Sequence, residues 1–420
     1  MIRKLIKRKR LKKIIKNNFY MTIFFRNIFF NSRALFHKAL FVLFFNFLFS
    51  AILPNVSNKC FWVTKNNLVD SVSVNQVINF VKKNEIDKVF FQVRSRGDAL
   101  YNSSLVPKCE LVLNDFDPLD YFLQKKYEMD VEVHAWFNTY ILWSNKVLPN
   151  DSLHFYYQCP ECLESDFNGK SDKNTILSQY QSKNWEGIYL SPIHPKVNVH
   201  ILEVINELIS KYDLDGVHLD YVRYQDSFYG YNPEGLNQFI SKFNFDPKDI
   251  NRGIISPRFG YPKSYIDSLK VVWKEHRSNK ITELVRSLKY SFINDSLNIQ
   301  LSAAVKPNFV NSKNRWFQDW SSWIKEDLID FAVIMNYDTD FNDFNFINDQ
   351  ILSEFSFNDI KENIFIGISC YNQSFNQIAD KVLFSRFQGF ENYSLFPYNV
   401  QKDTTDWYNP IFNVLNFKMY

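Results

Sequence analysis

The sequence predicts a (β/α)8 barrel, the TIM-barrel fold, and three observations favour it. From residue 60 onward, eight short runs rich in Val, Ile and Phe alternate with amphipathic helical stretches. The runs are almost continuously apolar, as expected of parallel strands that are buried on both faces. The chain has only 10 glycines and no phosphate-binding glycine loop, which disfavours the runner-up fold, a doubly wound open sheet. We therefore expect one α/β barrel over residues 60–420.

Each predicted strand is followed by a segment that can form a helix. The strands are expected at residues 61–64, 88–94, 131–138, 216–222, 299–305, 331–337, 364–370 and 393–398. The helices are expected at residues 74–83, 116–127, 197–212, 264–294, 316–327, 346–355, 374–387 and 403–417. The loops after strands three and four, residues 139–196 and 225–263, exceed ordinary barrel loops. Both emerge at the C-terminal face, so we expect them to wall a cleft. Their aromatic side chains either stack on sugar rings there or pack within the loops themselves.

Residues 1–59 form a basic leader. They contain 13 of the 49 Lys and Arg residues and no Asp or Glu. The apolar run 39–53 has the length of a signal-peptide core and is short for a membrane span. Met21 offers an alternative start, and Ser50 or Ala51 offers a small residue for cleavage. We expect export to the periplasm, the cell surface or the medium. The alternative is an uncleaved membrane anchor at 39–53, the only segment expected to contact a membrane.

The charge of the remaining chain argues against a nucleic-acid partner. The whole chain has a formal net charge of +4, but outside the leader 36 basic residues face 45 acidic ones, a balance of −9. A body that bound nucleic acid would be expected to carry a basic surface.

Cys159 and Cys162 form a lone CPEC motif in a chain of five cysteines. An odd number rules out a complete set of intramolecular disulfides. A local disulfide or structural thiols are one interpretation of the motif. A metal site completed by His154 or His194 is another. Redox catalysis is disfavoured, because no thioredoxin-like strand and helix frame the motif.

The alternation of side chains along the strands predicts a polar cluster in the upper barrel interior. If Asp220 points inward, so does His218, whereas Val217, Leu219 and Tyr221 face the helices. The same alternation directs inward Glu132, His134, Trp136 and Asn138 on strand three, Ser302, Ala304 and Lys306 on strand five, and Ala332, Ile334, Asn336 and Asp338 on strand six. Such polar groups are costly inside an ordinary core, so they indicate a functional site.

Six segments resemble the bacterial glycosyl-hydrolase-like family ten. They are VFFQVRSRGDALYNSS at 89–104, VEVHAWFN at 131–138, LSPIHP at 190–195, YDLDGVHLDYVRY at 212–224, WSSWIKEDLIDFAVIMNY at 320–337 and SLFPY at 394–398. They occur in matching order over about residues 60–400. The resemblance implies a (β/α)8 barrel and an exported glycosidase acting on cell-envelope or extracellular polysaccharide, with peptidoglycan glycan strands among the substrates. Ser191 stands where family members commonly carry Asp.

Asp220 is the first predicted catalytic residue. Glycoside hydrolysis needs one carboxyl that protonates the leaving oxygen and another that stabilises, or attacks at, the anomeric carbon. Asp220 is assigned the second role, because the nearby charge of Arg223 would keep it ionised. A structural salt bridge between Asp220 and Arg223 is the alternative.

The proton donor is expected from another strand. The spacing from Asp215 to Asp220 resembles the fourth strand of chitinase-type barrels, but Val222 stands where those barrels have a catalytic Glu. Asp338, after strand six, and Asp98, after strand two, are the two candidates. Asp98 could instead hold a sugar hydroxyl or brace Arg94.

The remaining predicted site residues are assigned to substrate binding. They are Arg94, His134, Trp136, Asn138, His218, Arg223, Tyr224, Lys306, Asn336, Tyr371 and Tyr398. His134 and His218 either hold the carboxylates or are satisfied interior histidines. Metal ligation by them would support a carbohydrate deacetylase, but no helical ligand spacing favours it. The favoured hypothesis is a glycoside hydrolase without a metal or cofactor, and the alternative is a non-catalytic carbohydrate-binding barrel.

Overall fold

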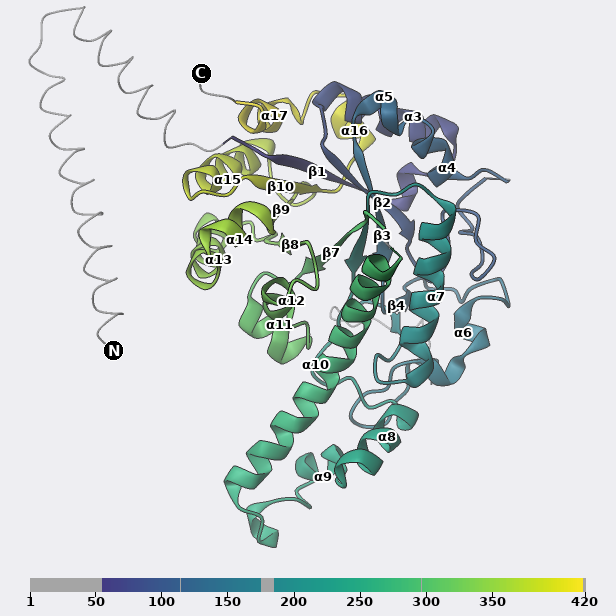
Figure 1. Cartoon of the computed structure of the whole chain (residues 1–420), viewed down its shortest axis with the longest axis vertical. Helices are drawn as coiled ribbons and strands as arrows, with labels where there is room; N and C mark the ends of the chain where they lie inside the picture. The colour runs from purple at the N-terminus through teal and green to yellow at the C-terminus, as the bar shows by residue number, and fades with distance from the viewer. Residues whose placement is uncertain (1–54, 114, 175–184, 296, 418–420) are drawn as a thin grey trace, which may run out of the picture. The chain divides into compact units, whose positions relative to one another are not determined.

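The first and last strands of the barrel pair with each other and close the sheet. The computed structural model describes residues 55–417 except 114, 175–184 and 296, and its barrel is shown in Figure 1. All eight strands are parallel, in the order β1-β10-β9-β8-β7-β6-β3-β2. They are β1 (Asn58–Val63), β2 (Lys88–Arg94), β3 (Glu132–Asn138), β6 (Gly216–Asp220), β7 (Gln300–Val305), β8 (Phe331–Met335), β9 (Ile364–Ser369) and β10 (Asn392–Phe396). The predicted (β/α)8 barrel and its eight strands are confirmed.

Helices connect the strands on the outside of the barrel. They are α3 (Ser71–Asn84), α4 (Pro118–Leu123), α5 (Lys126–Met129), α7 (Pro195–Lys211), α10 (Lys263–Asn294), α11 (Phe309–Arg315), α12 (Trp320–Lys325), α13 (Phe341–Glu354), α14 (Phe357–Glu362), α15 (Phe375–Phe387), α16 (Val400–Asp403) and α17 (Asn409–Leu415). Local sequence sets their starts. α3 begins with a capping box between Asp70 and Ser73, and α7 begins with His194 as N-cap and Pro195 in the first turn.

The barrel interior confirms most of the predicted side-chain directions. Val217 and Leu219 belong to the outer core under the helices, whereas Trp136 and Ala304 belong to the inner cluster. His218 stacks on the inner Phe90 with ring centroids 4.1 Å apart. Glycine is required at the start of β6, because a Cβ on Gly216 would lie 2.1 Å from the ring of His134.

The predicted directions on β8 are wrong. The pairing of β7 with β8 sets Ser302 beside Phe331 and Ala304 beside Val333. Paired residues of parallel strands share a face, so Phe331 and Val333 fill the interior beside the small side chains of β7. Ala332, Ile334 and Asn336 consequently face the outer helices. The two outer apolar residues pack in the outer core.

The two long loops contain small elements of their own and contact each other. The first holds β4 (Ile141–Trp143), α6 (Phe155–Gln158), η2 (Pro160–Cys162), η3 (Asp172–Asn174) and β5 (Ile188–Tyr189), with β4 and β5 antiparallel. The second holds α8 (Pro233–Phe243), α9 (Pro247–Asn251) and η5 (Pro257–Phe259). The backbone N–H of Tyr231 donates to Ser165 O at 3.1 Å. In Figure 1, α8, α9 and the first half of α10 extend away from the barrel strands.

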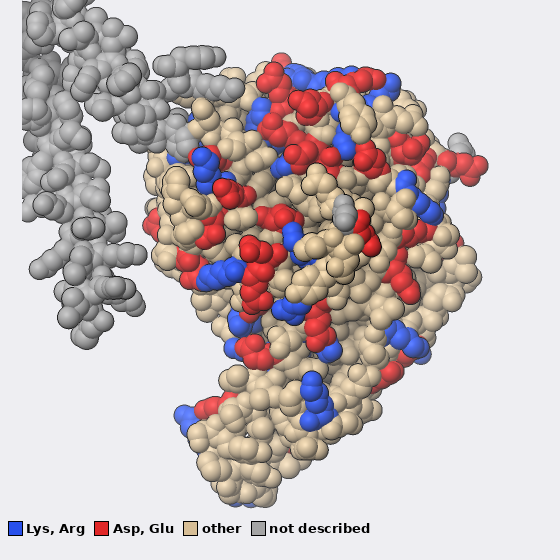
Figure 2. Space-filling model, viewed as in Figure 1, with Lys and Arg blue, Asp and Glu red and all other residues tan. Residues whose placement is uncertain are grey.

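Residues 1–54 of the predicted leader, with the run 39–53, lie outside the described residues. One compact unit covers Asn55–Phe417, and β1 begins at Asn58, two residues before the predicted boundary. Among the helices of the described residues, none has the length and apolar character needed to cross a membrane. On the face shown in Figure 2, acidic and basic side chains are interspersed without a continuous basic patch.

Candidate active site

A cleft of about 610 Å³ opens at the carboxyl ends of the barrel strands. Residues that follow β1, β2 and β10 line it, together with the ends of β3 and β6. Trp136 and Asn138 lie on one wall, and Phe396 on another. Among the described residues, two carboxylates line the cleft, Asp220 and Glu186. This is the face on which TIM-barrel enzymes carry their active sites.

Asp220 is the buried carboxyl of this cleft. The pairing of β3 with β6 sets Asn138 beside Asp220. The Asp220 side chain accepts a hydrogen bond of 2.7 Å from the backbone N–H of Tyr221, and the residue is 8% exposed. Burial raises the pKa of Asp220 to about 6, against the lowering effects of the Tyr221 N–H and the charges of Arg223 and Lys306. Asp220 therefore keeps its proton at mildly acidic pH, where an ordinary aspartate is ionised.

Glu186 is the ionised carboxyl of the cleft. Arg223 Nη2 lies 3.0 and 2.9 Å from its two carboxylate oxygens, and the Tyr189 hydroxyl donates to Oε2 at 2.5 Å. Burial alone would raise the pKa of Glu186, but the Arg223 charge and the Tyr189 hydroxyl outweigh it and leave the pKa below its ordinary value. Glu186 is therefore ionised over the range in which Asp220 titrates.

The expected salt bridge between Asp220 and Arg223 is absent from the described residues, because Arg223 pairs with Glu186. The prediction that Arg223 keeps Asp220 ionised is therefore wrong, although its charge does oppose the effect of burial. Lys306 adds a second positive charge near both carboxylates. Burial and Arg223 lower the pKa of Lys306 to about 8, against the raising effects of Glu186 and Asp220.

Four predicted site residues line the cleft: Trp136, Asn138, Asp220 and Tyr398. Asn138 donates to Ser95 O at 2.9 Å, and its amide oxygen has no partner in the described structure. The Trp136 indole N–H is close enough to Asp220 to lower its pKa, without a full hydrogen bond to it. Tyr371 is 60% exposed and packs against the cleft residue Phe396 with ring centroids 6.0 Å apart.

Asp338 and Asn336 do not reach the cleft, because the side chains of β8 that were predicted to face the barrel interior face the outer helices instead. Asn336 donates to Phe344 O at 2.9 Å and to Asn348 Oδ1 at 3.1 Å, both on α13. Asp338 is exposed, and its carboxylate accepts from the backbone N–H of Asp340 at 3.0 Å. Neither lines the cavity, so the assignment of Asp338 as the acid and of Asn336 as a substrate ligand is wrong.

Asp98 and Arg94 act within the protein rather than at the cleft surface. The Asp98 carboxylate accepts from the backbone N–H of Arg96 at 2.9 Å, inside its own loop. Arg94 is 1% exposed and donates to Asn138 O at 3.1 Å, packed 5.0 Å from the Phe137 ring centroid on the helix side. Neither side chain lines the cavity. Asp98 is therefore not placed to donate a proton, and Arg94 holds the Asn138 backbone instead of a sugar.

His134, His218 and Tyr224 are core residues. Both histidines are 0% exposed; His218 Nδ1 lies 2.7 Å from Ser302 Oγ, and His134 Nε2 lies 3.2 Å from Glu132 Oε2. Tyr224 is 1% exposed and packs edge-on against Phe317. Their assignment to substrate binding is corrected, since the protein already surrounds them. Both histidines are interior residues, but they are not fully satisfied, because His134 Nδ1 and His218 Nε2 have no hydrogen-bond partner in the described structure.

Glu186 is the main residue that sequence reasoning missed. It lies in NWEGIY, the segment that leads into the short strand β5. This segment has neither the alternation of a strand nor the spacing of an amphipathic helix, so its pattern does not indicate a functional residue. Tyr221 was also misplaced: a left-handed backbone with φ of +50° takes it off the strand alternation and into the cleft lining. A left-handed non-glycine residue beside a candidate catalytic Asp is a typical active-site feature.

The CPEC motif and Ser191 lie together behind the cleft wall. Cys159 and Cys162 form a disulfide, one of the forms considered from the sequence. Ser191 is fully buried and donates to Glu164 Oε1 at 2.9 Å. Burial raises the pKa of Glu164 to about 8. Ser191 thus hydrogen-bonds a buried carboxyl. An aspartate at this position would instead place a second acidic group beside Glu164.

Known proteins resemble this chain in sequence. Glycosyl hydrolase DigH of Escherichia coli (strain K12) is 26% identical over 184 residues, which cover 41% of this chain and 38% of DigH. Glycosyl hydrolase YngK of Bacillus subtilis (strain 168) is 22% identical over 317 residues, which cover 70% of this chain and 55% of YngK. The chain thus matches less than two thirds of the length of either relative.

Solved structures share the fold. The PgaB (BpsB) glycoside hydrolase domain from Bordetella bronchiseptica superposes with a TM-score of 0.64 at 14% identity, covering 87% of this chain and 100% of that domain. The catalytic domain of β-amylase from Paenibacillus polymyxa gives a TM-score of 0.55 at 12% identity, covering 86% of this chain and 98% of that domain. At this level of identity the likeness concerns the barrel alone.

The family profile named Glycosyl hydrolase-like 10 matches residues 57–385, which includes all of β1 to β9 and the cleft residues up to α15. The match spans the first five of the six resembling segments and ends before SLFPY at 394–398. The resemblance to the family is thereby confirmed, and this chain belongs to the glycosyl hydrolase-like 10 family.

Proposed function

We propose that this chain is an exported glycoside hydrolase that cleaves cell-envelope or extracellular polysaccharide, with peptidoglycan glycan strands as the favoured substrate. The observation that carries the proposal is the presence of two carboxyls in one cleft whose pKa values are shifted in opposite directions. Enzymes commonly obtain an acid and a base from two similar groups by placing them in environments that shift their pKa values apart.

The difference between the two pKa values assigns the catalytic roles. Asp220, with a pKa of about 6, is the general acid that protonates the glycosidic oxygen. Glu186, held ionised by Arg223, either attacks the anomeric carbon or removes a proton from the attacking water. This exchanges the role first assigned to Asp220, because burial rather than Arg223 dominates its titration.

The cleft also carries groups suited to an anionic glycan. Lys65 and Arg96 line it beside the aromatic side chains of Trp136 and Phe396. Aromatic faces stack on sugar rings, and the two cations can pair with carboxylate substituents such as the lactyl groups of muramic acid. A neutral polysaccharide would leave both cations unpaired. The family membership and the basic, apolar leader support an exported enzyme of the cell envelope.

The test is a glycan-release assay on purified peptidoglycan and a panel of polysaccharides, comparing the wild type with Asp220→Asn. We expect release of reducing ends by the wild type and none above background by the variant. Nuclear magnetic resonance of the first product then reports its anomeric configuration: retention identifies Glu186 as nucleophile, and inversion identifies it as base. Saturable binding without turnover by the wild type would instead establish a non-catalytic carbohydrate-binding barrel.

Export is tested separately by cell fractionation of the full chain and of a variant lacking residues 1–54. We expect the full chain outside the cytoplasm and the truncated chain inside it. Equal distribution of the two would refute the targeting role of the leader.

A further inference from the structure

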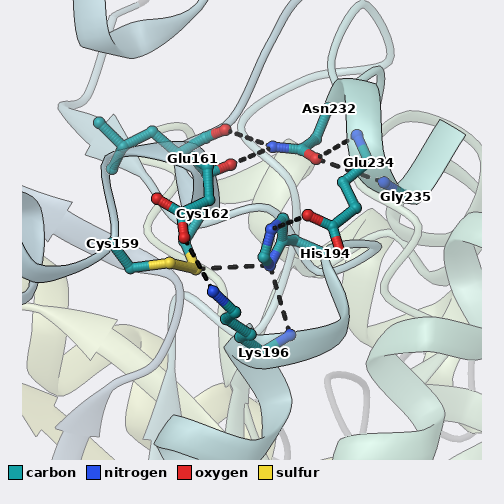
Figure 3. The surroundings of a disulfide bond; sticks show 9 residues. Cys159, Glu161, Cys162, His194, Lys196, Asn232, Glu234 and Gly235 are labelled. Carbon is teal, nitrogen blue, oxygen red and sulfur yellow. Dashed lines mark hydrogen bonds and ion pairs between the residues drawn. A yellow bond between two sulfur atoms is a disulfide. The ribbon is translucent and has the colours of Figure 1, made fainter. Parts of the chain in front are cut away.

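A cluster of two cysteines, a histidine and a carboxylate lies outside the cleft, where the two long loops meet (Figure 3). Cys159 and Cys162 follow α6, His194 caps α7, and Glu234 lies in the first turn of α8. The two cysteines and the histidine are 3%, 0% and 1% exposed. The proposed hydrolysis uses none of them, so the cluster calls for a separate explanation.

The three buried side chains have the arrangement of metal ligands. One ligand atom from each lies within 4.8 Å of the others. His194 Nδ1 lies 3.4 Å from Cys162 Sγ. In a tetrahedral zinc site, with Zn–S of about 2.3 Å and Zn–N of about 2.0 Å, neighbouring sulfur and nitrogen ligands lie roughly 3.5 Å apart. The observed separation therefore fits a shared zinc ion.

Glu234 orients the histidine for this role. Its Oε2 lies 3.2 Å from His194 Nε2, on the side of the ring opposite the sulfurs. The contact lacks hydrogen-bond geometry in the described structure, but a small rotation of the carboxylate would let it accept from Nε2–H and leave the Nδ1 lone pair directed at the cysteines. Zinc-bound histidines typically have such a carboxylate partner on their second nitrogen.

The fourth ligand would be water, or Glu161 after a rotation of its side chain. Glu161 lies between the two cysteines in sequence, but its carboxylate is outside the group of ligand atoms and pairs with the exposed Lys196, with Oε1 and Nζ 2.9 Å apart. The Nδ1 lone pair of His194 also accepts a long hydrogen bond of 3.3 Å from the Lys196 backbone N–H. Metal binding would release that N–H, which belongs to a helix N-terminus open to water.

We propose that Cys159, Cys162 and His194 form a zinc site in the dithiol state of the protein, and that the disulfide is the metal-free state of the same site. A dithiol reductant supplies two electrons and two protons to the Cys159–Cys162 bond and itself becomes a disulfide. One Zn²⁺ then replaces the two thiol protons and takes His194 Nδ1 as its third ligand. The disulfide joins only Cys159 to Cys162, whereas the zinc ion would also join both cysteines to His194 at the start of α7.

The segment that holds the two cysteines is hydrogen-bonded to its neighbours on the second long loop and near the cleft. Asn232, the N-cap of α8, donates to the carbonyl oxygens of Glu161 and Leu163 at 2.7 and 2.9 Å. The backbone N–H of Ser191 donates to Cys162 O at 2.9 Å, just after the strand that follows Glu186. The proposal does not depend on the glycosidase activity, and its tests use metal binding.

The experiment measures zinc on the purified full chain, oxidised or reduced with a phosphine, after gel filtration in zinc-containing buffer followed by metal-free buffer. We expect about one zinc per reduced chain and none per oxidised chain. Cobalt(II) in place of zinc should give thiolate charge-transfer absorption. Cys162→Ser should bind no zinc in either state, and Cys109→Ala, which removes a buried cysteine outside the cluster, should bind as the wild type does.

Two further variants separate a metal site from a structural disulfide. His194→Asn keeps a side-chain acceptor at the helix N-cap and should lose zinc, whereas Glu234→Gln should weaken it by about 10- to 100-fold. Glu161→Gln should weaken binding if its carboxylate is the fourth ligand and leave it unchanged if water is. Zinc content in the reduced wild type no higher than in Cys162→Ser, or unaltered binding by His194→Asn, would overturn the proposal. Reduction that unfolds the chain without refolding by zinc, as followed by circular dichroism, would also overturn it.

Discussion

Arg223 forms its ion pair with Glu186, a residue 37 positions earlier in the chain, and not with Asp220, three positions earlier. The guanidinium thereby stabilises the charge of one cleft carboxylate and leaves the other dominated by burial. In the proposed mechanism, this pairing distinguishes the base, Glu186, from the acid, Asp220.

The roles of the two carboxyls predict different responses to leaving-group chemistry. Asp220→Asn should lower the rate on natural glycans by about 10²–10⁴-fold, because protonation of the leaving oxygen is lost. Aryl glycosides with acidic phenol leaving groups need little protonation, so the same variant should retain much of its activity on them. Glu186→Gln should lose activity on both. Steady-state kinetics on the two substrate classes checks this, with the exposed Asp338→Asn as the unaffected control. Equal losses by Asp220→Asn on both classes would contradict the acid role.

The pH profile should be bell-shaped with an acidic optimum. Catalysis needs Asp220 protonated, so kcat/KM should fall about tenfold per pH unit above about pH 6. It also needs Glu186 ionised, so activity should fall below the lowered pKa of that residue. The measurement is kcat/KM against pH at constant ionic strength. A profile that keeps rising through pH 8 would exclude Asp220 as the acid.

Arg223 should control the acidic limb of that profile. Arg223→Gln removes the charge that lowers the pKa of Glu186, so the acidic limb should move to higher pH. Arg223→Lys keeps a charge with poorer geometry and should move the limb less. The alkaline limb, set mainly by the burial of Asp220, should move little by comparison. An acidic limb that stays in place in both variants would show that another group titrates there.

Asp220 should reduce stability at neutral pH. Its pKa rises from 3.8 to about 6 on folding, so the folded state loses stability as the pH increases through that interval. The cost above pH 6 is about 3 kcal/mol, since one pKa unit corresponds to about 1.4 kcal/mol. Asp220→Asn should therefore raise the free energy of unfolding at pH 8 and change it little near pH 4. Denaturant titration at the two pH values measures the difference, and equal effects at both would refute it.

Lys65 should favour anionic substrates. Lys65→Gln removes a cleft cation, so KM for glycans with carboxylate substituents should rise by roughly 1.5- to 5-fold, the range of a solvent-exposed ion pair. Neutral oligosaccharides should be unaffected, and kcat should change little on either. Parallel KM measurements on lactyl-bearing and neutral glycans test the expectation. An equal rise on both would indicate general damage to the cleft.

The site residues that were predicted correctly lie on strands in which inward-facing and helix-facing side chains could be told apart from the sequence. On β6 the apolar residues Val217 and Leu219 mark the helix-facing side, which correctly directed His218 inward. On β3 the same alternation correctly directed Asn138 inward, beside Asp220. On β8 both faces are apolar, so the sequence pattern left the phase open, and the polar residues after the strand suggested the wrong one. Its phase follows from the pairing with β7, a contact between distant segments.

The sequence by itself determined the barrel, because eight apolar strands that alternate with amphipathic helices have few other ways to bury both faces of a parallel sheet. It also determined that Asp220 ends a strand at the functional face. Only the tertiary structure decided the electrostatics of the site, since Glu186 belongs to a loop without a period and the charges that act on each carboxyl come from segments far apart in sequence. Local pattern encodes which face of a strand is apolar, whereas a pKa depends on burial and on neighbours that folding brings together.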